Sequence, residues 1–231
     1  MVIVRLQTSF GRVFGQRCFY LFVALIALIA AAPFLGGTLQ GRFLITGVQV
    51  LVLIAAVAAV GRTTMPFVIA LLLGIPAFGF LAASQWQPED TTFYLEVATA
   101  FFVAFYLVAV TYLLRYVFSP DVMTDDKLFG AAAAYLMLGI MWAYAYTLVQ
   151  FFDPQAFGAR PGEARRPFYD LLFVSFGYLT SNGPGDIVVT GSKVRALVIL
   201  EQVFGVLFVA ILIARLAGIY PPVRRGERRE R

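Results

Sequence analysis

The sequence predicts an all-α membrane protein with six transmembrane helices and a re-entrant helix and loop between the fifth and the sixth. Composition supports a membrane protein, because 61% of the residues are hydrophobic and only 13% are charged. Soluble domains carry about 25% charged residues. The mean hydropathy of +0.83 agrees with this class. The order of apolar and polar segments along the chain then predicts the number and the places of the helices.

Six apolar segments are long enough, or nearly long enough, to cross a bilayer, which requires about 20 apolar residues in one helix. The links between them are short, except for the link before the last segment, which covers about 153–191. The first segment follows several arginines, as a signal peptide would, but its nearly full membrane length favours a retained span. The six segments are 19–35, 43–60, 65–83, 93–118, 128–152 and 192–219.

The distribution of basic residues predicts the orientation of the chain. The formal net charge is +5, and with six spans most of the Lys and Arg residues fall on the side of the two chain ends. Because basic residues favour the cytoplasmic side, we expect both termini in the cytoplasm and the protein in the inner (plasma) membrane. The basic charge then reflects orientation and contact with membrane lipid, and nucleic acid is not expected as a partner.

Residue types that carry most enzyme chemistry are scarce in this chain. There is no histidine, the single cysteine Cys18 excludes an intrachain disulfide, and the apolar segments hold no cluster of carboxylates. We therefore expect neither an enzyme nor a cofactor. A transporter would more often show repeated halves with broken helices, and the sequence has no visible repeat.

The first four segments, within residues 1–118, are predicted to form a four-helix unit like a voltage sensor that lacks its charges. A voltage-sensing helix needs several arginines within the membrane. The fourth segment has only Glu96 near one end and Arg115 near the other. A lone terminal arginine extends to the interface, so we predict no strong voltage gating.

A short linker, 119–127, precedes the last two spans, and a basic tail, 221–231, follows them. Ser119 followed by Pro120 fits the start of an interfacial helix that connects the front unit to the last two spans. A capped turn fits these residues equally well. The tail is too short for a ligand-binding domain, and its arginines fit an anchor at the cytoplasmic face.

The long link before the last span contains an apolar half-helix. Pro167 suits the first helical position, and the ~13 residues that follow extend only about 20 Å. A half-helix entering from outside would end at Thr180 near mid-membrane, where its partial negative charge favours a cation. The next residues, TSNGPGD, are polar and rich in glycine. A non-helical segment is tolerated at this depth of the membrane only where protein buries it or where it lines a water-filled path.

The segment FYDLLFVSFGYLTSNGPGDIVVT resembles the pore helix and selectivity filter of the potassium channel superfamily. In that family, a TTVGYGD-type motif follows an aromatic-rich helix. Thr180 and Ser181 match the two threonines, while Gly183, Gly185 and Asp186 match the two glycines and the aspartate. The resemblance implies that this segment is an ion-selectivity filter.

The fifth and sixth segments are similar to the outer and inner helices of the bacterial two-transmembrane pore module, so the resemblance covers a pore domain at 128–220. It implies a six-span subunit, with K⁺ or Na⁺ as the permeant ion. One loop per chain cannot enclose a path, and four copies around an axis can, so we expect a homotetramer. Asp186 would then form a carboxylate ring at the outer mouth.

Two residues depart from the family motif. Asn182 stands where valine is usual, and Pro184 stands where tyrosine or phenylalanine is usual. Proline keeps its carbonyl. Carbonyl rings from Ser181, Asn182, Gly183 and Pro184, with the Ser181 hydroxyl at the inner end, are therefore feasible. For this geometry we expect positive φ at Gly183 and Gly185, the glycines on both sides of Pro184. Asn182 either supplies an amide anchor or turns toward the ion path. An exposed turn is the competing interpretation.

Two residues of the last span complete the candidate site. Glu201 is an ionisable group within a span and is therefore a functional candidate. We expect it to brace the pore helix, and pairing with Arg195 is the alternative. Gly205 is a candidate hinge of the inner helix, and a packing role for this glycine is equally compatible with the sequence.

The leading hypothesis is a tetrameric cation channel that passes K⁺ passively through backbone carbonyls and is not strongly gated by voltage. The alternative keeps the fold but has a poorly selective or non-conducting filter, and the protein then serves a regulatory or structural role.

Overall fold

The described part of the chain is entirely helical apart from turns and loops. The structure is a computed structural model that describes residues 17–35, 47–49, 51–52, 54–56, 64–86, 91–120, 124–158 and 164–219. Its fully bounded helices are α2 (Arg17–Leu35), α4 (Thr64–Trp86), α5 (Thr91–Val117), α6 (Asp125–Phe152), α7 (Phe168–Leu179) and α8 (Ser192–Ile219).

Four helices are long and apolar enough to cross a membrane, and they indicate a multi-pass membrane protein. These candidate spans are Val68–Trp86, Thr91–Val117, Asp125–Phe152 and Ser192–Ala217. They correspond to the third, fourth, fifth and sixth predicted spans. The first predicted span lies within α2, which contains a shorter apolar stretch. The second predicted span falls partly outside the described residues, and so do the basic tail and most of the N-terminal arginines.

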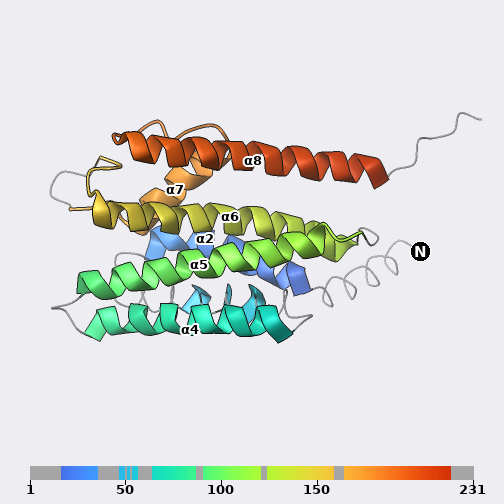
Figure 1. The fold of residues 1–231 in the computed structure, drawn as a ribbon, viewed down its shortest axis with the longest axis horizontal. Coiled ribbons are helices and arrows are strands. Elements are labelled where there is room, and N and C mark those ends of the chain that lie inside the picture. Colours follow the sequence, from blue (N-terminus) through green and yellow to red (C-terminus); the bar gives the residue numbers. More distant parts are fainter. Residues whose placement is uncertain are drawn as a thin grey trace, which may run out of the picture.

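The helices lie side by side in layers, with α6 at the centre (Figure 1). Helix α5 packs against both α4 and α6, and α2 packs against α6. The short helix α7 sits between α6 and α8. The front helices α2, α4 and α5 therefore lie on one side of α6, and the elements of the candidate site lie on the other.

Helix α6 begins at Asp125, three residues before the predicted start of the fifth span, because Thr124 caps it. The Thr124 hydroxyl accepts a hydrogen bond from the Lys127 backbone N–H at 3.4 Å. Asp125 and Asp126 in the first turn complement the positive end of the helix dipole. The Ser119 hydroxyl donates to the Tyr116 carbonyl at the end of α5. Ser119 thus closes a turn there.

The junction of α5 and α6 also fixes the start of α2 and the C-terminal end of α8. The Asp126 carboxylate accepts hydrogen bonds from the Cys18 backbone N–H at 3.0 Å and from the Tyr116 hydroxyl at 2.7 Å. The Arg215 guanidinium of α8 donates to the Ser119 carbonyl. The Asp126 carboxylate thereby satisfies the Cys18 N–H, a backbone donor in the first turn of α2 that has no partner within its own helix.

An aromatic stack joins the front helices to α7. The Tyr144 ring of α6 lies 4.8 Å from Phe102 and 5.7 Å from Tyr106, both on α5, measured between ring centroids. On its other side, Tyr144 lies 4.5 Å from Phe168 in the first turn of α7. The Gln49 amide donates to the Tyr144 hydroxyl at 2.5 Å. This satisfies two polar groups that are buried among apolar rings.

Candidate functional site

The candidate site is built around α7, a helix too short to cross a bilayer. Its 12 residues extend about 18 Å. Pro167 is its N-cap with φ −66° and Thr180 is its C-cap, which agrees with the predicted half-helix to within one residue at its start. Proline suits this position because its fixed φ is compatible with the helix and its missing N–H leaves no donor to satisfy.

The start of α7 is fixed by residues that the sequence did not single out. The buried Gln150 side chain of α6 donates to the Arg166 carbonyl at 3.2 Å and accepts from the Arg166 N–H at 3.0 Å. The Arg166 guanidinium donates to the carbonyls of Phe157 and Gly158 and pairs with Asp170 at 3.3 Å. An amide side chain inside an apolar span is the sequence signal that could have identified Gln150.

The chain after α7 turns back on the end of the helix. The N–H of Ser181 donates to the Tyr178 carbonyl at 2.9 Å, and the N–H of Asn182 donates to the Gly177 carbonyl at 2.9 Å. These two bonds form a Schellman motif, with Ser181 at its left-handed position. The Gly183 N–H donates to the same Gly177 carbonyl at 2.8 Å. Carbonyls that the helix cannot satisfy internally thereby gain partners.

The positive φ angles fall at different residues from those predicted. Ser181 has φ 62° and Gly183 has φ 69°, whereas Gly185 is not in the positive region. The expectation of positive φ on both sides of Pro184 is therefore wrong for Gly185. The sign of φ alternates from Ser181 through Pro184, since Asn182 and Pro184 have negative φ. Ser181 adopts the left-handed conformation because the helix cap requires it there, at a cost of roughly 1–2 kcal/mol for a non-glycine residue.

This backbone turns successive carbonyls away from α7. All peptide bonds in the described chain are trans, so each C=O points opposite to the N–H of the same peptide unit. The N–H groups of Ser181, Asn182 and Gly183 point at α7, so the carbonyls of Thr180, Ser181 and Asn182 point away from it. Among the described residues, none of these three carbonyls accepts a hydrogen bond.

Pro184 is buried against α7, and Gly177 makes room for it. A Cβ atom on Gly177 would lie 3.1 Å from the Pro184 nitrogen and 3.2 Å from the Gly183 carbonyl carbon. The chain therefore runs back alongside the last turn of α7. Ser181, Asn182, Gly185 and Asp186 stay exposed, so the proline is the residue of this segment that packs inward.

The Asn182 amide makes a local bond at the end of α7. It donates to the Thr180 hydroxyl at 3.2 Å, and the Thr180 hydroxyl donates to the Phe176 carbonyl at 2.7 Å. This bond stays within the cap of α7 and reaches no neighbouring helix. Both alternatives for the Asn182 side chain, an amide anchor and a turn toward the ion path, stay predictions.

The end of α7 lies halfway along α8. Gly205 is the fourteenth of the 28 residues of α8, and a Cβ atom on it would collide with the Leu179 carbonyl. The Tyr135 hydroxyl of α6 donates to the same carbonyl at 3.3 Å. At Gly205, α8 thus lies directly against the last residue of α7. The helix is continuous there, and the hinge role stays a prediction.

Glu201 links three helices. It is fully buried, its Oε2 accepts from the Tyr146 hydroxyl of α6, and its Oε1 lies 2.5 Å from the Ser175 hydroxyl of α7. The predicted alternative, a pair with Arg195, is not formed, because that guanidinium donates to the Val189 carbonyl at 3.2 Å.

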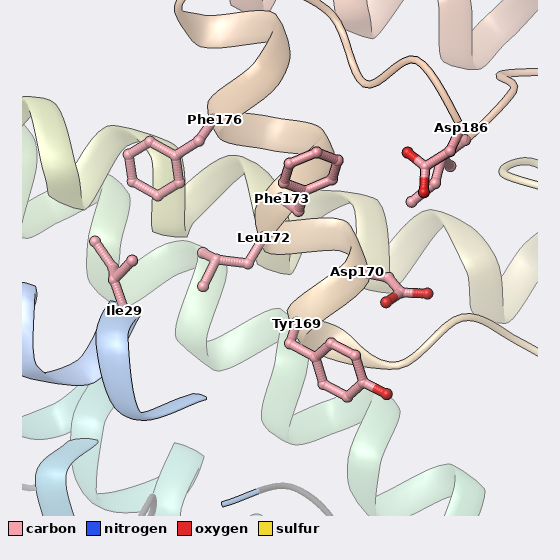
Figure 2. Close-up of a pocket in the computed structure, with 8 residues that line it drawn as sticks. Ile29, Tyr169, Asp170, Leu172, Phe173, Phe176 and Asp186 are labelled. Atoms are coloured by element: carbon pink, nitrogen blue, oxygen red, sulfur yellow. The ribbon is translucent and has the colours of Figure 1, made fainter. Parts of the chain in front are cut away.

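A cavity of about 420 Å³ opens beside α7. Figure 2 shows its lining, with Ile29 of α2 and Phe176 on one side and Asp170 and Asp186 on the other. Leu172 and Phe173 complete most of the apolar wall. Asp186 is therefore an exposed residue that lines this cavity.

No group of three or more His, Cys, Asp and Glu side chains in the described part of the chain is placed to hold a metal ion. No protein-family model, no curated protein and no solved structure matches the chain.

The contact at Gly205 predicts a specific loss of stability. Gly205→Ala places a methyl group against a backbone carbonyl that cannot rotate away, and overpacking of this kind costs about 1–3 kcal/mol. A helical chain of this size should lose about 2–4 °C in Tm for each kcal/mol, measured by thermal unfolding in detergent. Gly79→Ala in α4 is the matched control, because nothing lies within 4 Å of its added Cβ. Equal Tm values for the two variants would contradict the described packing.

Proposed function

We propose that four copies of this chain assemble into a cation channel of the potassium channel superfamily and that K⁺ passes through a filter at Thr180–Gly185. One observation carries the proposal. The carbonyls of Thr180, Ser181 and Asn182 lie about halfway along α8, point away from α7 and accept no hydrogen bond from the described residues. Backbone carbonyls that replace the hydration shell of an ion are the means by which such filters select.

The electrostatics of this place favour a cation. The C-terminal end of α7 carries a partial negative charge, and the three free carbonyls add oxygen dipoles on the side away from the helix. The Ser181 hydroxyl makes no hydrogen bond within the described residues and is available at the inner end. We include the carbonyls of Gly183 and Pro184 in the filter as well, as the family resemblance implies.

The uncovered surface of α8 supports the assembly of several copies. Helix α8 touches α6 and α7 along one side, while large apolar side chains remain exposed from Ile199 to Ile213. A single copy with one filter segment cannot surround an ion. A homotetramer places four such segments around one axis and covers part of α8 with neighbouring copies, and lipid covers the rest of the apolar surface.

The remaining parts of the chain fit a channel subunit of the inner (plasma) membrane. This subunit has six spans, and both of its termini lie in the cytoplasm. In the described part of the front unit, Arg115 is the basic residue of the last turn of α5, where it lies 5.6 Å from the Tyr112 ring centre. A terminal arginine moves little charge across the membrane. The channel is therefore passive and not strongly gated by voltage.

The alternative, a channel-like protein whose filter does not conduct, has one observation in its favour. The alternation of φ stops before Gly185, and Pro184 is packed inward against Gly177. If that part of the segment stays closed in the assembly, the fold serves a regulatory or structural role. Ion flux separates the two functions.

A planar bilayer with K⁺ on one side and Na⁺ on the other tests the proposal. We expect current from the purified protein and a reversal potential displaced from zero in the direction set by K⁺, since the filter carbonyls replace the hydration of the larger ion. Protein-free bilayers are the control. A reversal potential near zero would contradict selectivity, and the absence of current at every applied voltage would favour the alternative function.

The two unusual filter residues predict a gain of selectivity on reversion. Pro184→Tyr combined with Asn182→Val restores the family motif, so we expect the reversal potential of the double variant to move further toward that of a K⁺-selective pore. Each single variant serves as a control for the other. If the potential of the double variant equals that of the original protein, these residues do not limit selectivity.

A further inference from the structure

The contacts at Glu201 require more protons than the neighbouring hydroxyl groups can supply. The Ser175 hydroxyl lies 2.7 Å from the Gly139 carbonyl and 2.5 Å from Oε1 of Glu201, and the Tyr146 hydroxyl contacts Oε2. Each of these three oxygen–oxygen contacts needs one proton between its atoms. Ser175 and Tyr146 each bring one. The third contact lacks a proton if Glu201 is a carboxylate.

A proton on Oε1 of Glu201 completes the set. The carboxylic acid then donates to the Ser175 hydroxyl, Ser175 donates to the Gly139 carbonyl, and Tyr146 donates to Oε2. The close approach of α6 and α7 at Gly139 makes this chain of bonds possible, because a Cβ there would lie 2.7 Å from the Phe176 ring. Every polar atom of the cluster is satisfied in this arrangement.

No positively charged side chain of the described residues pairs with Glu201 to stabilise a carboxylate. Glu201, Ser175 and Tyr146 are all fully buried. Among the described residues, no cation forms an ion pair with Glu201. The titratable groups that face it are Tyr135 and Tyr146 on α6 and Tyr178 on α7. A buried charge without a partner is strongly disfavoured, so the acid keeps its proton.

We infer that Glu201 is a protonated acid at neutral pH and that its proton locks α7 between α6 and α8. Ser175 lies one turn before Leu179, where α7 ends. Loss of the proton would break the bond to Ser175 and place a bare charge in the junction of the three helices. Alkaline pH therefore loosens the helix that presents the candidate filter. This inference rests on the contacts of the described chain, and it holds whether or not the assembly conducts.

Two measurements on the full-length protein in detergent test the proton. Infrared difference spectroscopy at neutral pH should show the carbonyl stretch of a protonated carboxylic acid that disappears in Glu201→Gln and persists in Glu96→Gln, the matched control in α5. Thermal unfolding should show that the Tm of the original protein falls by about 3 °C for each pH unit as pH rises from about 5 to the pH at which the folded chain also loses the proton. Between these limits the unfolded chain has released a proton that the folded chain holds.

The Glu201→Gln variant distinguishes a role for the Glu201 proton from a role in packing alone. Its amide N–H can donate to Ser175 and its oxygen can accept from Tyr146, so we expect a Tm at neutral pH within about 2 °C of the original and a flatter dependence of Tm on pH above about pH 5. Three results would overturn the inference. They are the absence of the acid band, a large loss of Tm in Glu201→Gln at neutral pH, or an unchanged dependence of Tm on pH in that variant.

Discussion

A helix that ends against the middle of a neighbouring helix leaves its last carbonyl groups without partners in its own helix, and this constraint organises the site. The chain meets it by turning the N–H groups of Ser181, Asn182 and Gly183 back toward α7. Because each trans peptide unit points its carbonyl the opposite way, the cap leaves three carbonyls in succession facing outward. The arrangement that satisfies the helix end is therefore the same arrangement that the proposed filter uses to offer oxygen ligands to a cation.

The position of this helix end depends on glycines and on polar contacts to the flanking helices. Gly205 lets α8 approach the Leu179 carbonyl, and Gly177 lets the returning chain approach α7. Tyr135 and Glu201 then hold α7 from the α6 and α8 sides. Helix α6 carries partners for both ends of α7 and also packs on the front helices, so displacement of the front unit would reach the site through α6.

The sequence was sufficient to predict the parts that follow from local composition. Apolar length predicted α4, α5, α6 and α8, and Pro167 with the short apolar run predicted α7 within a residue at its start. The φ angle of Gly185 was predicted wrongly, because the expected alternation of φ ends at Pro184 and glycine permits positive φ without requiring it. The partners of Glu201 depend on contacts between residues 26 to 55 positions apart, and a single sequence does not contain such pairings.

A structure of the purified, membrane-extracted protein in K⁺ would test the central claim most directly. We predict four copies around one axis, with ion density on that axis at the level of the Thr180, Ser181 and Asn182 carbonyls. The same segment turned toward lipid, or a particle in which the four segments do not meet on a common axis, would contradict the assignment of these carbonyls to an ion path.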